Sequence, residues 1–218
     1  MDGLIVAITK ETRDMNPFQN LIHINIPVVF FARPPKDDSF DYVMADNEDA
    51  AFKATDFLIK KGHKRIGHIM APEVMALSHT RLEGYKMALN KSKIKFDPTL
   101  VKVVDLTEES THLAMSQYIK MKNPPTGIFS FKNYINLDAI EYLKRNNPAK
   151  LKKIDFTGFG NLPLFRYLDQ KPLASIEENS YMIGYETAKL LFRKINSQES
   201  EEKEVPQHIK VACELVIH

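Results

Sequence analysis

The sequence predicts an α/β protein built on parallel β-sheets flanked by helices. Short apolar runs alternate with longer amphipathic segments along most of the 218 residues. Strands that alternate with helices pair in parallel through right-handed crossover connections. A hydrophobic fraction of 44% with 27% charged residues is ordinary for a globular protein and argues against wholesale disorder. The length suffices for one large domain or two small ones, each with its own core.

Each predicted strand is a run of apolar residues bounded by polar or turn residues. These runs span residues 3–8, 26–31, 66–70, 100–104, 126–131, 154–159 and 173–176. The predicted helices carry apolar residues at helical spacing and span residues 16–23, 47–61, 80–90, 109–122, 135–145 and 180–195. Residues 196–204 are expected to form a charged surface linker. Residues 209–217 alternate apolar with polar or small side chains, and this period of two predicts one half-exposed strand.

The stretch Leu58–Met70, followed by Arg81, carries the most information about ligand binding. Gly62 lies where a helix takes a left-handed C-cap, and the lysines around it suit a helix C-terminus. These lysines are most simply solvated helix ends. A strand begins directly afterwards, and Arg81 is expected at the start of the helix that follows this strand. Ligands of α/β proteins bind at the carboxyl ends of parallel strands, so Arg81 is a candidate binding residue.

Composition excludes several classes of function. The net charge of +2 is too small for an obvious polyanion binder, and no basic block resembles a DNA-binding arm. Cys213 is the single cysteine, so no disulfide framework and no cysteine metal site is expected, which favours a reducing, cytoplasmic location. The N-terminus does not resemble a signal peptide, and no apolar run approaches the roughly 18 residues that span a membrane.

Motifs for catalysis and for cofactors are also missing. Ser78, His79 and Glu83 suggest a nucleophile and a base, but no Gly-x-Ser-x-Gly motif or orienting acid accompanies them. The segment Gly158-Phe-Gly160 is too short for a dinucleotide fingerprint, and the seven histidines show no pair at metal-ligand spacing. We therefore expect a protein that is not an enzyme and that has no cofactor and no metal site.

A series of motifs, in a fixed order and spacing, runs from Gly3 almost to the C-terminus. They are Asp2-Gly-Leu-Ile5, Ile26-Pro-Val-Val29 with Arg33, Val43-Met-Ala-Asp-Asn47 with Ala50 and Ala54, Leu58-Ile59 with Gly62-His63-Lys-Arg-Ile66, Arg81-Leu-Glu-Gly-Tyr85 with Ala88-Leu89, Pro125-Thr-Gly-Ile-Phe129, Asp155-Phe-Thr-Gly-Phe159, Pro172-Leu-Ala-Ser-Ile176, Gly184 with Ala188 and Leu191, and Glu214-Leu-Val216. Together they resemble the lactose-repressor (LacI/GalR) family of bacterial transcription regulators. One such motif is a weak signal, whereas the whole series in order and in register makes the resemblance specific.

The resemblance implies a two-lobed, periplasmic-binding-protein-like (type I) fold, in which an effector binds in the cleft between two α/β lobes. On this template, residues 1–45 and 178–212 form the N-terminal lobe, and residues 46–177 and 213–218 form the C-terminal lobe. The family's helix-turn-helix and the opening of its first lobe have no counterpart in this sequence, so the first lobe is expected to be incomplete. We expect a fragment of a longer regulator, and a degenerate relative is the alternative.

The resemblance also places the effector site at strand ends. The expected effector-binding residues are Arg81, Lys132, Asn133, Asn161, Ser78, Arg33 and Gly160. Many sugar-responsive members have aspartates where this chain has Phe31-Ala32 and Gly160, and Asn-Asp where it has Lys132-Asn133. Fewer carboxylates and an added lysine favour a sugar acid or sugar phosphate over a neutral sugar. Alternatively, the cleft has lost its ability to bind an effector, or it binds a protein corepressor. A further alternative is that Arg81 only pairs with Glu83 or another carboxylate.

The expected function is the effector-binding and dimerising region of a transcription regulator. Its expected partners are a small sugar-like or anionic effector and a second copy of the chain, since family members usually dimerise with their lobes side by side. Operator DNA would be bound only through the missing N-terminal domain, and no membrane contact is expected. The incomplete first lobe would leave a sheet edge and apolar helix faces exposed. The alternative function is a free-standing solute (sugar)-binding protein of the same fold.

Overall fold

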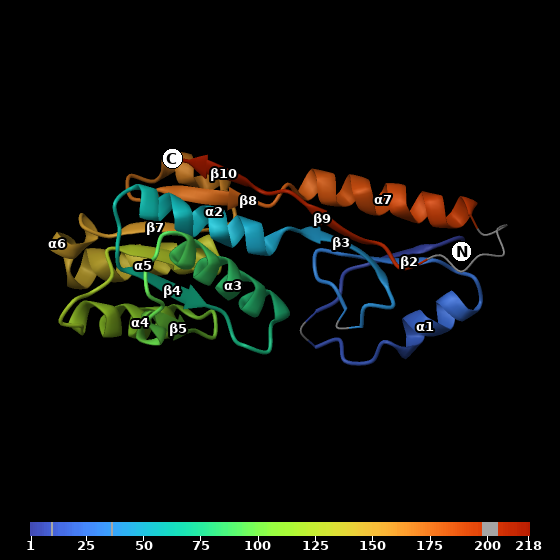
Figure 1. Ribbon diagram of the computed structural model, residues 1–218, viewed down its shortest axis with the longest axis horizontal. Coiled ribbons are helices and arrows are strands. Elements are labelled where there is room, and N and C mark those ends of the chain that lie inside the picture. Colours follow the sequence, from blue (N-terminus) through green and yellow to red (C-terminus); the bar gives the residue numbers. More distant parts are fainter. Residues whose placement is uncertain (10, 36, 198–204) are drawn as a thin grey trace. The chain divides into compact units, whose positions relative to one another are not determined.

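The computed structural model describes residues 1–9, 11–35, 37–197 and 205–218. The chain divides into two compact units, Met1–Asp46 with Asn179–Ala212, and Asn47–Glu178 with Cys213–His218 (Figure 1). Each unit therefore combines segments that lie far apart in the sequence. Most of the predicted linker, residues 198–204, lies outside the described residues.

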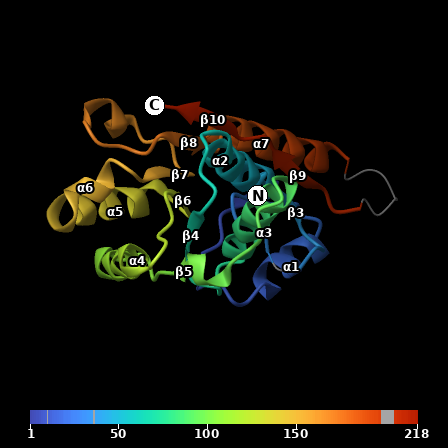
Figure 2. The ribbon, with the colours of Figure 1, turned by 60° about the vertical axis from the view of Figure 1, so that its left-hand side comes forward.

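The first unit is built on a parallel sheet. Its elements are β1 (Leu4–Val6), α1 (Asn16–His23), β2 (Val28–Phe31), β3 (Asp41–Ala45), α7 (Ser180–Asn196) and β9 (His208–Val211). Among the described residues this sheet has four strands in the order β1-β2-β3-β9, all paired in parallel. Helices α1 and α7 lie on opposite sides of it (Figures 1 and 2). Val28, Phe30 and Phe40 are buried, and Phe18 and Leu21 of α1 pack against them.

The second unit contains the larger sheet. Its elements are α2 (Asn47–Lys60), β4 (Ile66–Met70), α3 (Ala76–Lys91), the 3₁₀ helix η1 (Pro98–Leu100), β5 (Val101–Val103), α4 (Glu108–Lys120), β6 (Gly127–Ser130), α5 (Asn133–Asn146), α6 (Pro148–Leu151), β7 (Asp155–Phe159), the 3₁₀ helix η2 (Pro163–Tyr167), β8 (Ala174–Glu177) and β10 (Glu214–Ile217). In the described part of the chain the sheet has six strands in the order β10-β8-β7-β6-β4-β5. Strand β10 is antiparallel to β8, and the other pairs are parallel. This parallel-dominated arrangement confirms the predicted fold class.

Helices cover both faces of the second unit's sheet (Figure 2). On one face, buried residues of α4 and α5 such as Met115 and Leu143 form a single apolar core with Ile69 and Ile128 of the strands. On the other face, α2 and α3 pack against each other with their backbones in near contact. A Cβ atom at Gly84 would lie 2.2 Å from the carbonyl oxygen of Glu48, so glycine is required where the two helices meet.

Two strand predictions differ from the structure. The predicted single strand at residues 209–217 is wrong, because β9 and β10 belong to different sheets in different units. Alternation with a period of two shows only which residues share a face, so it does not reveal where a chain changes sheets. Strand β3 was not predicted as a strand. Its first residues, Asp41 and Tyr42, interrupt the apolar run, and α2 begins two residues after the strand ends.

Two local predictions around β4 have different outcomes. Gly62 has a φ of 100°, which confirms the predicted left-handed conformation after α2. Helix α3, however, begins at Ala76 and not near residue 80 as predicted. Met75, which precedes it, is extended and provides no side-chain cap, so the sequence contains no start signal at this point. Arg81 therefore lies in the second turn of α3 and not at its start.

His68 is a buried titratable side chain in the middle of β4. Its ring stacks between those of Tyr85 and Phe129, with centroid distances of 5.3 and 4.7 Å. Nδ1 donates to the carbonyl oxygen of Phe129 at 3.0 Å, and Nε2 is buried without a hydrogen-bond partner among the described residues. Burial lowers the pKa of His68 to about 4, so the imidazole is neutral in the folded protein at pH 7.

The free energy of unfolding should therefore fall as the pH is lowered from 7 to 5. The unfolded chain takes up a proton on His68 near the usual histidine pKa of about 6.5, whereas the folded protein takes it up only near pH 4. Because the unfolded state binds more protons in this window, His68 alone should lower stability at pH 5 by about 2 kcal/mol. Urea unfolding followed by circular dichroism at both pH values measures the difference.

Replacement of the imidazole tests the origin of this pH dependence. His68→Asn should be less stable at pH 7 but should lack the part of the pH dependence that comes from this ring. The exposed His79 of α3 provides a matched control, since His79→Asn should keep the wild-type difference between pH 7 and pH 5. An unchanged pH dependence in His68→Asn would contradict the assignment.

Candidate functional site

Most of the predicted site residues lie at one edge of the second unit's sheet. Strands β4, β6, β7 and β8 are neighbours and run parallel, so their carboxyl ends meet at the same edge. This carboxyl edge comprises residues 71–75 after β4, 131–132 after β6, 160–162 after β7 and Glu178 after β8. Arg81 of α3 reaches it from the side.

Arg81 ties four segments of the second unit together. Its side chain is 5% exposed. Nε and Nη2 donate to Oδ1 of Asn47, at 3.0 and 2.8 Å. Nη1 donates to the carbonyl oxygen of Phe131, and Nη2 also donates to Oε1 of Glu178 at 3.2 Å. These bonds join α3 to the start of α2 and to the ends of β6 and β8.

The guanidinium of Arg81 also lies against two aromatic rings. Its central carbon is 4.3 Å from the centroid of Phe131 and 3.4 Å from that of Phe159. Burial lowers the pKa of Arg81 to about 10, and the neighbouring Glu178 acts in the opposite direction. Arg81 is therefore a buried cation at pH 7, and its carboxylate partner is Glu178. Glu83, considered as a partner from the sequence, pairs with Lys86 at 2.8 Å.

Arg81 and Lys53 hold the points where the chain enters and leaves the second unit. Asn47 and Glu178 are the first and last residues of its long segment, and Cys213 begins its short one. Arg81 binds Asn47 and Glu178, while Nζ of Lys53 donates to the carbonyl oxygen of Cys213 at 3.1 Å. Each connection from this unit to the rest of the chain is thus anchored by a basic side chain.

Asn133, an expected effector ligand, is buried and bonded within the protein. Its Nδ2 lies 2.8 Å from both the carbonyl oxygen of Gly160 and Oγ of Ser175. Its Oδ1 accepts from Nδ2 of Asn136 at 2.7 Å. A Cβ atom at Gly158 would lie 2.6 Å from this Oδ1, so the packing depends on glycine. The amide of Asn133 fastens α5 to β7 and β8.

Ser78 and Gly160 also make internal contacts at the carboxyl edge. Ser78 is fully buried, and its Oγ donates to the carbonyl oxygen of Pro72 at 3.1 Å. Gly160 has a φ of 95°, which favours glycine, and its N–H donates to the carbonyl oxygen of Ile176 at 2.9 Å. The two residues shape the loops after β4 and β7.

Lys132 and Asn161 are the more accessible residues of the predicted set at this edge. Both are half-buried. The ammonium of Lys132 lies 5.7 Å from the ring centroid of Tyr134, and it forms no ion pair with any described residue. Lys132 therefore presents a charge at the end of β6, where it interacts electrostatically with Asp138 of α5 without forming an ion pair.

Arg33, the remaining predicted residue, belongs to the first unit. It is exposed, and its Nη1 donates to the carbonyl oxygen of Ile8 at 3.3 Å. Ala32 before it has a φ of 62°, an unusual conformation for a residue with a Cβ atom. The structure therefore places Arg33 beside β1 and β2 of its own unit.

Sequence reasoning did not identify Asn47, Glu178, Phe131 and Phe159 as site residues. Asn47 was recognised only as a helix start, and the two phenylalanines end apolar runs of the kind that form cores. Nothing in the sequence distinguishes Glu178 from Glu177 beside it. Their common feature is contact with Arg81, which only the folded chain reveals.

Two kinds of feature are missing from the described ranges. They contain no group of three or more His, Cys, Asp or Glu side chains that could hold a metal ion. A search of the same residues for a helix long and apolar enough to cross a membrane also found none.

Comparisons with known proteins agree with this architecture. Residues 1–218 match the family described as periplasmic binding proteins and sugar binding domain of LacI family. The chain belongs to this family. The HTH-type transcriptional repressor CytR of Escherichia coli (strain K12) is 37% identical to it over 156 residues, which cover 72% of this chain and 46% of CytR. The LacI-family chain described here thus matches less than half the length of that curated relative.

Solved structures of LacI-type regulators share the fold. The putative transcriptional regulator LacI from Bacillus cereus subsp. cytotoxis matches with a TM-score of 0.79 and 28% identity, over 99% of this chain and 74% of that chain. The complex of the transcriptional regulator CelR with cellobiose matches with a TM-score of 0.81 and 25% identity, over 99% of this chain and 64% of that chain. The family suggested by the sequence motifs is confirmed.

Removal of the Arg81 side chain should destabilise the LacI-family fold strongly. Arg81→Met removes the Arg81 donors to buried acceptors on Asn47 and Phe131, and it removes the ion-pair partner of Glu178. Because Glu178 is 38% exposed and can be hydrated, the main cost is the loss of the donor to the buried acceptors, which should lower the free energy of unfolding by about 2–4 kcal/mol. Urea unfolding at pH 7 measures the change.

A second basic residue of α3 provides the control. Lys86 pairs with Glu83 on the surface of the same helix. Lys86→Met should change stability by less than about 1 kcal/mol, as is usual for exposed ion pairs. Equal effects of Arg81→Met and Lys86→Met would show that Arg81 does not hold the carboxyl edge together.

Proposed function

We propose that this chain is the effector-binding region of a LacI-type transcription regulator and that it binds a small sugar-like ligand at the carboxyl edge. The observation that carries the proposal is the cluster of Arg81, Asn47 and Glu178 where the strand ends meet. The relative CytR is a transcriptional repressor, and the related CelR structure contains cellobiose. In this proposal the regulator works in the cytoplasm, is not an enzyme, and binds operator DNA through a domain outside this chain.

The side chains of the carboxyl edge would have different roles toward a ligand. The side chain of Glu178 is 38% exposed, and its carboxylate can accept hydrogen bonds from sugar hydroxyls. Asn161, half-buried, offers both a donor and an acceptor. Arg81 is largely covered, so its role is chiefly to position Glu178. Ser78 and Asn133 would act in the same indirect way, by fixing the loops around the ligand.

Lys132 would distinguish acidic from neutral ligands. Arg81 already faces a carboxylate, so an anionic group that bound Arg81 would compete with Glu178. Lys132 forms no ion pair with a described residue, although Asp138 lies near enough to interact with it, and its side chain is partly accessible. We therefore infer that a carboxylate or phosphate of the ligand would bind Lys132, with a sugar acid or sugar phosphate as the preferred class. The backbone of Gly160 and the side chain of Arg33, from the first unit, are further proposed ligand contacts.

Ligand binding at this edge could be transmitted along the chain itself. Asn47 and Glu178 stand at the connections to the first unit, and both are bonded to Arg81. A ligand whose hydroxyls bind the Glu178 carboxylate would weaken the hydrogen bond between Glu178 and Arg81. The connections at Asn47 and Glu178 would then change position. A ligand contact that is stronger in one conformation than in another couples ligand binding to a conformational change elsewhere in the protein.

Replacement of Lys132 tests the proposed preference. In the full-length regulator, Lys132→Ala should weaken binding of a sugar acid or sugar phosphate by about tenfold to a hundredfold, the usual effect of one charge-assisted contact. Binding of a neutral sugar of the same size should change by less than about twofold. Calorimetry with a panel of sugar acids, sugar phosphates and neutral sugars measures both.

Lys144→Ala is the matched control, because Lys144 is exposed at the opposite end of α5. It should leave all affinities unchanged. A neutral sugar that binds tightly and equally to wild type and Lys132→Ala would exclude the anionic class but retain a sugar effector. Glu178→Gln then tests the site itself, and unchanged affinity for every bound ligand in that variant would refute binding at the carboxyl edge.

We also propose that the chain associates with a second copy through the first unit. Three aromatic side chains on one face of α7 are exposed: Tyr181 by 80%, Tyr185 by 51% and Phe192 by 65%. Gly184 and Ala188 lie between them, and nothing is within 4 Å of a Cβ atom built at Gly184. Large rings beside a shallow notch of small residues make this face complementary to itself, as a two-fold symmetric interface requires.

Light scattering at micromolar concentration tests this association. The wild-type chain should be a dimer or larger, and Tyr181→Ser with Phe192→Ser should shift it toward the monomer. Tyr167→Ser, which changes a 74% exposed tyrosine of the second unit, should have no such effect. A monomeric wild-type chain would contradict the proposal.

A further inference from the structure

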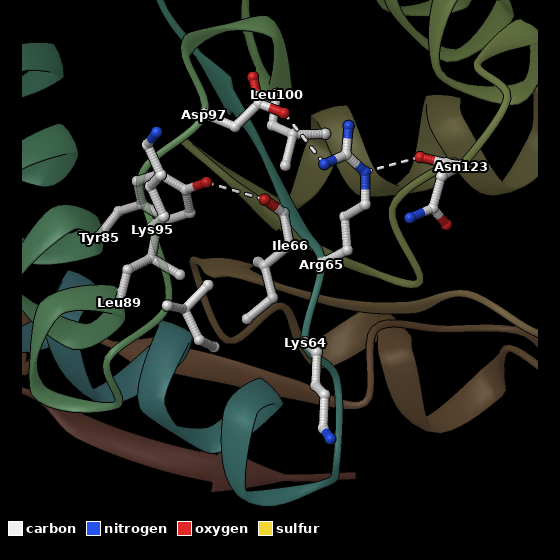
Figure 3. Close-up of a pocket in the computed structure, with 10 residues that line it drawn as sticks. Lys64, Arg65, Ile66, Tyr85, Leu89, Lys95, Asp97, Leu100 and Asn123 are labelled. Carbon is white, nitrogen blue, oxygen red and sulfur yellow. Dashed lines mark hydrogen bonds and ion pairs between the residues drawn. The ribbon is translucent and has the colours of Figure 1, made fainter.

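A cavity of about 240 Å³ lies at the amino edge of the second unit's sheet, the edge opposite Arg81. It is lined by residues 64–66 at the start of β4, Tyr85 and Leu89 of α3, Ile94, Lys95 and Asp97 of the following loop, Leu100 of η1, and Asn123 after α4 (Figure 3). This amino-edge pocket shares no residue with the proposed effector site.

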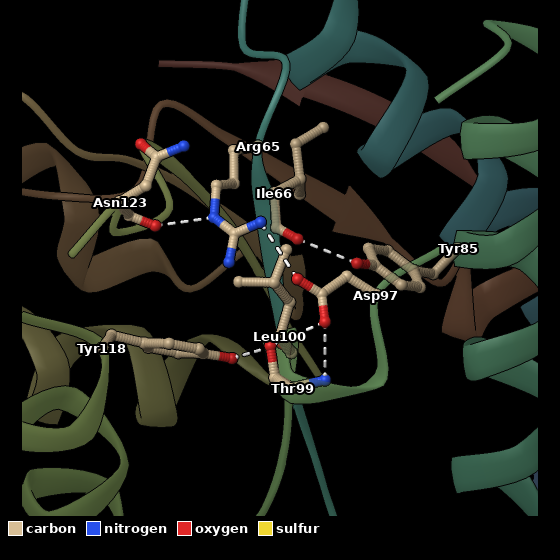
Figure 4. A network of polar contacts seen from close by, with 8 residues as sticks. All are labelled: Arg65, Ile66, Tyr85, Asp97, Thr99, Leu100, Tyr118 and Asn123. Carbon is tan, nitrogen blue, oxygen red and sulfur yellow. Dashed lines mark hydrogen bonds and ion pairs between the residues drawn. The ribbon is translucent and has the colours of Figure 1, made fainter. Parts of the chain in front are cut away.

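The pocket combines apolar walls with cations. Ile66, Leu89 and Leu100 are buried or nearly so, and Ile94 is half-buried. Tyr85 is fully buried behind the pocket, and its hydroxyl donates to the carbonyl oxygen of Ile66 at 2.8 Å (Figure 4). These side chains form the apolar floor of the pocket, and half-buried Ile94 is the part of it most open to the apolar or aromatic body of a ligand.

Arg65 is held in position beside this apolar surface. Its Nε donates to the carbonyl oxygen of Asn123 at 2.6 Å, and its Nη1 donates to Oδ2 of Asp97 at 3.0 Å (Figure 4). Asp97 is itself fixed, because its Oδ1 accepts from both the N–H and the hydroxyl of Thr99. Nη2 of Arg65 has no partner among the described residues, and the side chain is 30% exposed. Two hydrogen bonds therefore fix the guanidinium, and Nη2 stays available to donate to an anion.

The charge at the pocket is unbalanced. Lys64 and Lys95 are exposed, and neither forms an ion pair or hydrogen bond with a described residue. Asp97 is the single carboxylate among the lining residues, and Arg65 already pairs with it. The Lys64 ammonium points away from the Arg65 guanidinium (Figure 3), whereas Lys95 adds positive charge at the pocket without a counter-charge, which favours an anionic ligand.

We propose that the amino-edge pocket is a second binding site, for a small molecule that joins an aromatic or apolar body to one carboxylate or phosphate group. The cavity is smaller than the roughly 300–1,000 Å³ of pockets for drug-sized ligands, which limits the ligand to about one ring with its anionic group. Tyr85 and Leu89 continue the buried face of α3 on which Arg81 lies. A ligand here would therefore touch the same helix as the proposed effector site.

Phenyl phosphate is the probe for this site, with phenol and inorganic phosphate as its two halves. Calorimetry on the purified protein should show saturable binding of phenyl phosphate, at least about tenfold tighter than either half, because the pocket offers both an apolar wall and charge-assisted bonds. Absence of saturable binding, or equal binding of inorganic phosphate, would overturn the proposal.

Variants locate the binding. Lys95→Glu reverses an exposed charge without removing an internal contact and should weaken phenyl phosphate by about tenfold or more. Arg65→Met should have at least the same effect, while Arg145→Met, a change of an exposed arginine on α5, should have none. Lys132→Ala should also leave phenyl phosphate binding unchanged. If Lys132→Ala abolished it while Lys95→Glu did not, the probe would bind at the carboxyl edge and the amino-edge site would be refuted.

Discussion

The requirement to neutralise and hydrogen-bond one buried cation organises the second unit of this chain. Arg81 is almost fully covered, so its N–H groups must find acceptors within the protein. Asn47, Phe131 and Glu178 provide them, and the ring of Phe159 covers one face of the guanidinium. The start of α2 and the ends of three neighbouring strands are therefore held in one arrangement. The cation itself is buried while its carboxylate partner is partly exposed, so the loss of the Arg81 hydrogen bonds to buried acceptors would be the main cost of replacing it.

The requirement that buried polar groups form hydrogen bonds also explains why residue type alone does not identify the residues that contact a ligand. Asn133 and Ser78 are polar residues near strand ends, yet their polar atoms are bonded to other parts of the protein. An unbonded amide or hydroxyl in these buried positions would be destabilising, so the fold provides each with a partner. Lys132 and Asn161, at the same edge, keep part of their surface accessible. Accessibility, and not polarity, divides the candidate residues into those that support the site and those that can touch a ligand.

Helix α3 connects the two ends of the second unit's sheet. Arg81 in its second turn reaches the carboxyl edge, and Tyr85 and Leu89 further along line the amino-edge pocket. The helix is rigidly seated, because Gly84 brings it into near backbone contact with α2 and Tyr85 stacks on the buried His68. A small displacement of such a closely packed helix is not absorbed locally. Helix α3 is thus the element that the two proposed sites share.

The sequence by itself determined the α/β class, most strands and helices, the cap at Gly62 and the family. These follow from local periodicity, from glycine chemistry and from motifs in register. Local patterns did not reveal strand β3, the early start of α3 or the division of residues 209–217 between two sheets, because these depend on weak local signals or on pairing with distant strands. Only the family resemblance predicted a lobe boundary between residues 212 and 213. The sequence also placed Arg81 near the strand ends, but it did not reveal the partners of this side chain. Asn47 and Glu178 lie 34 and 97 residues away from it in sequence. Tertiary packing alone decides which charged side chains are removed from water and paired with such distant groups. It also decides which ones stay accessible to a ligand.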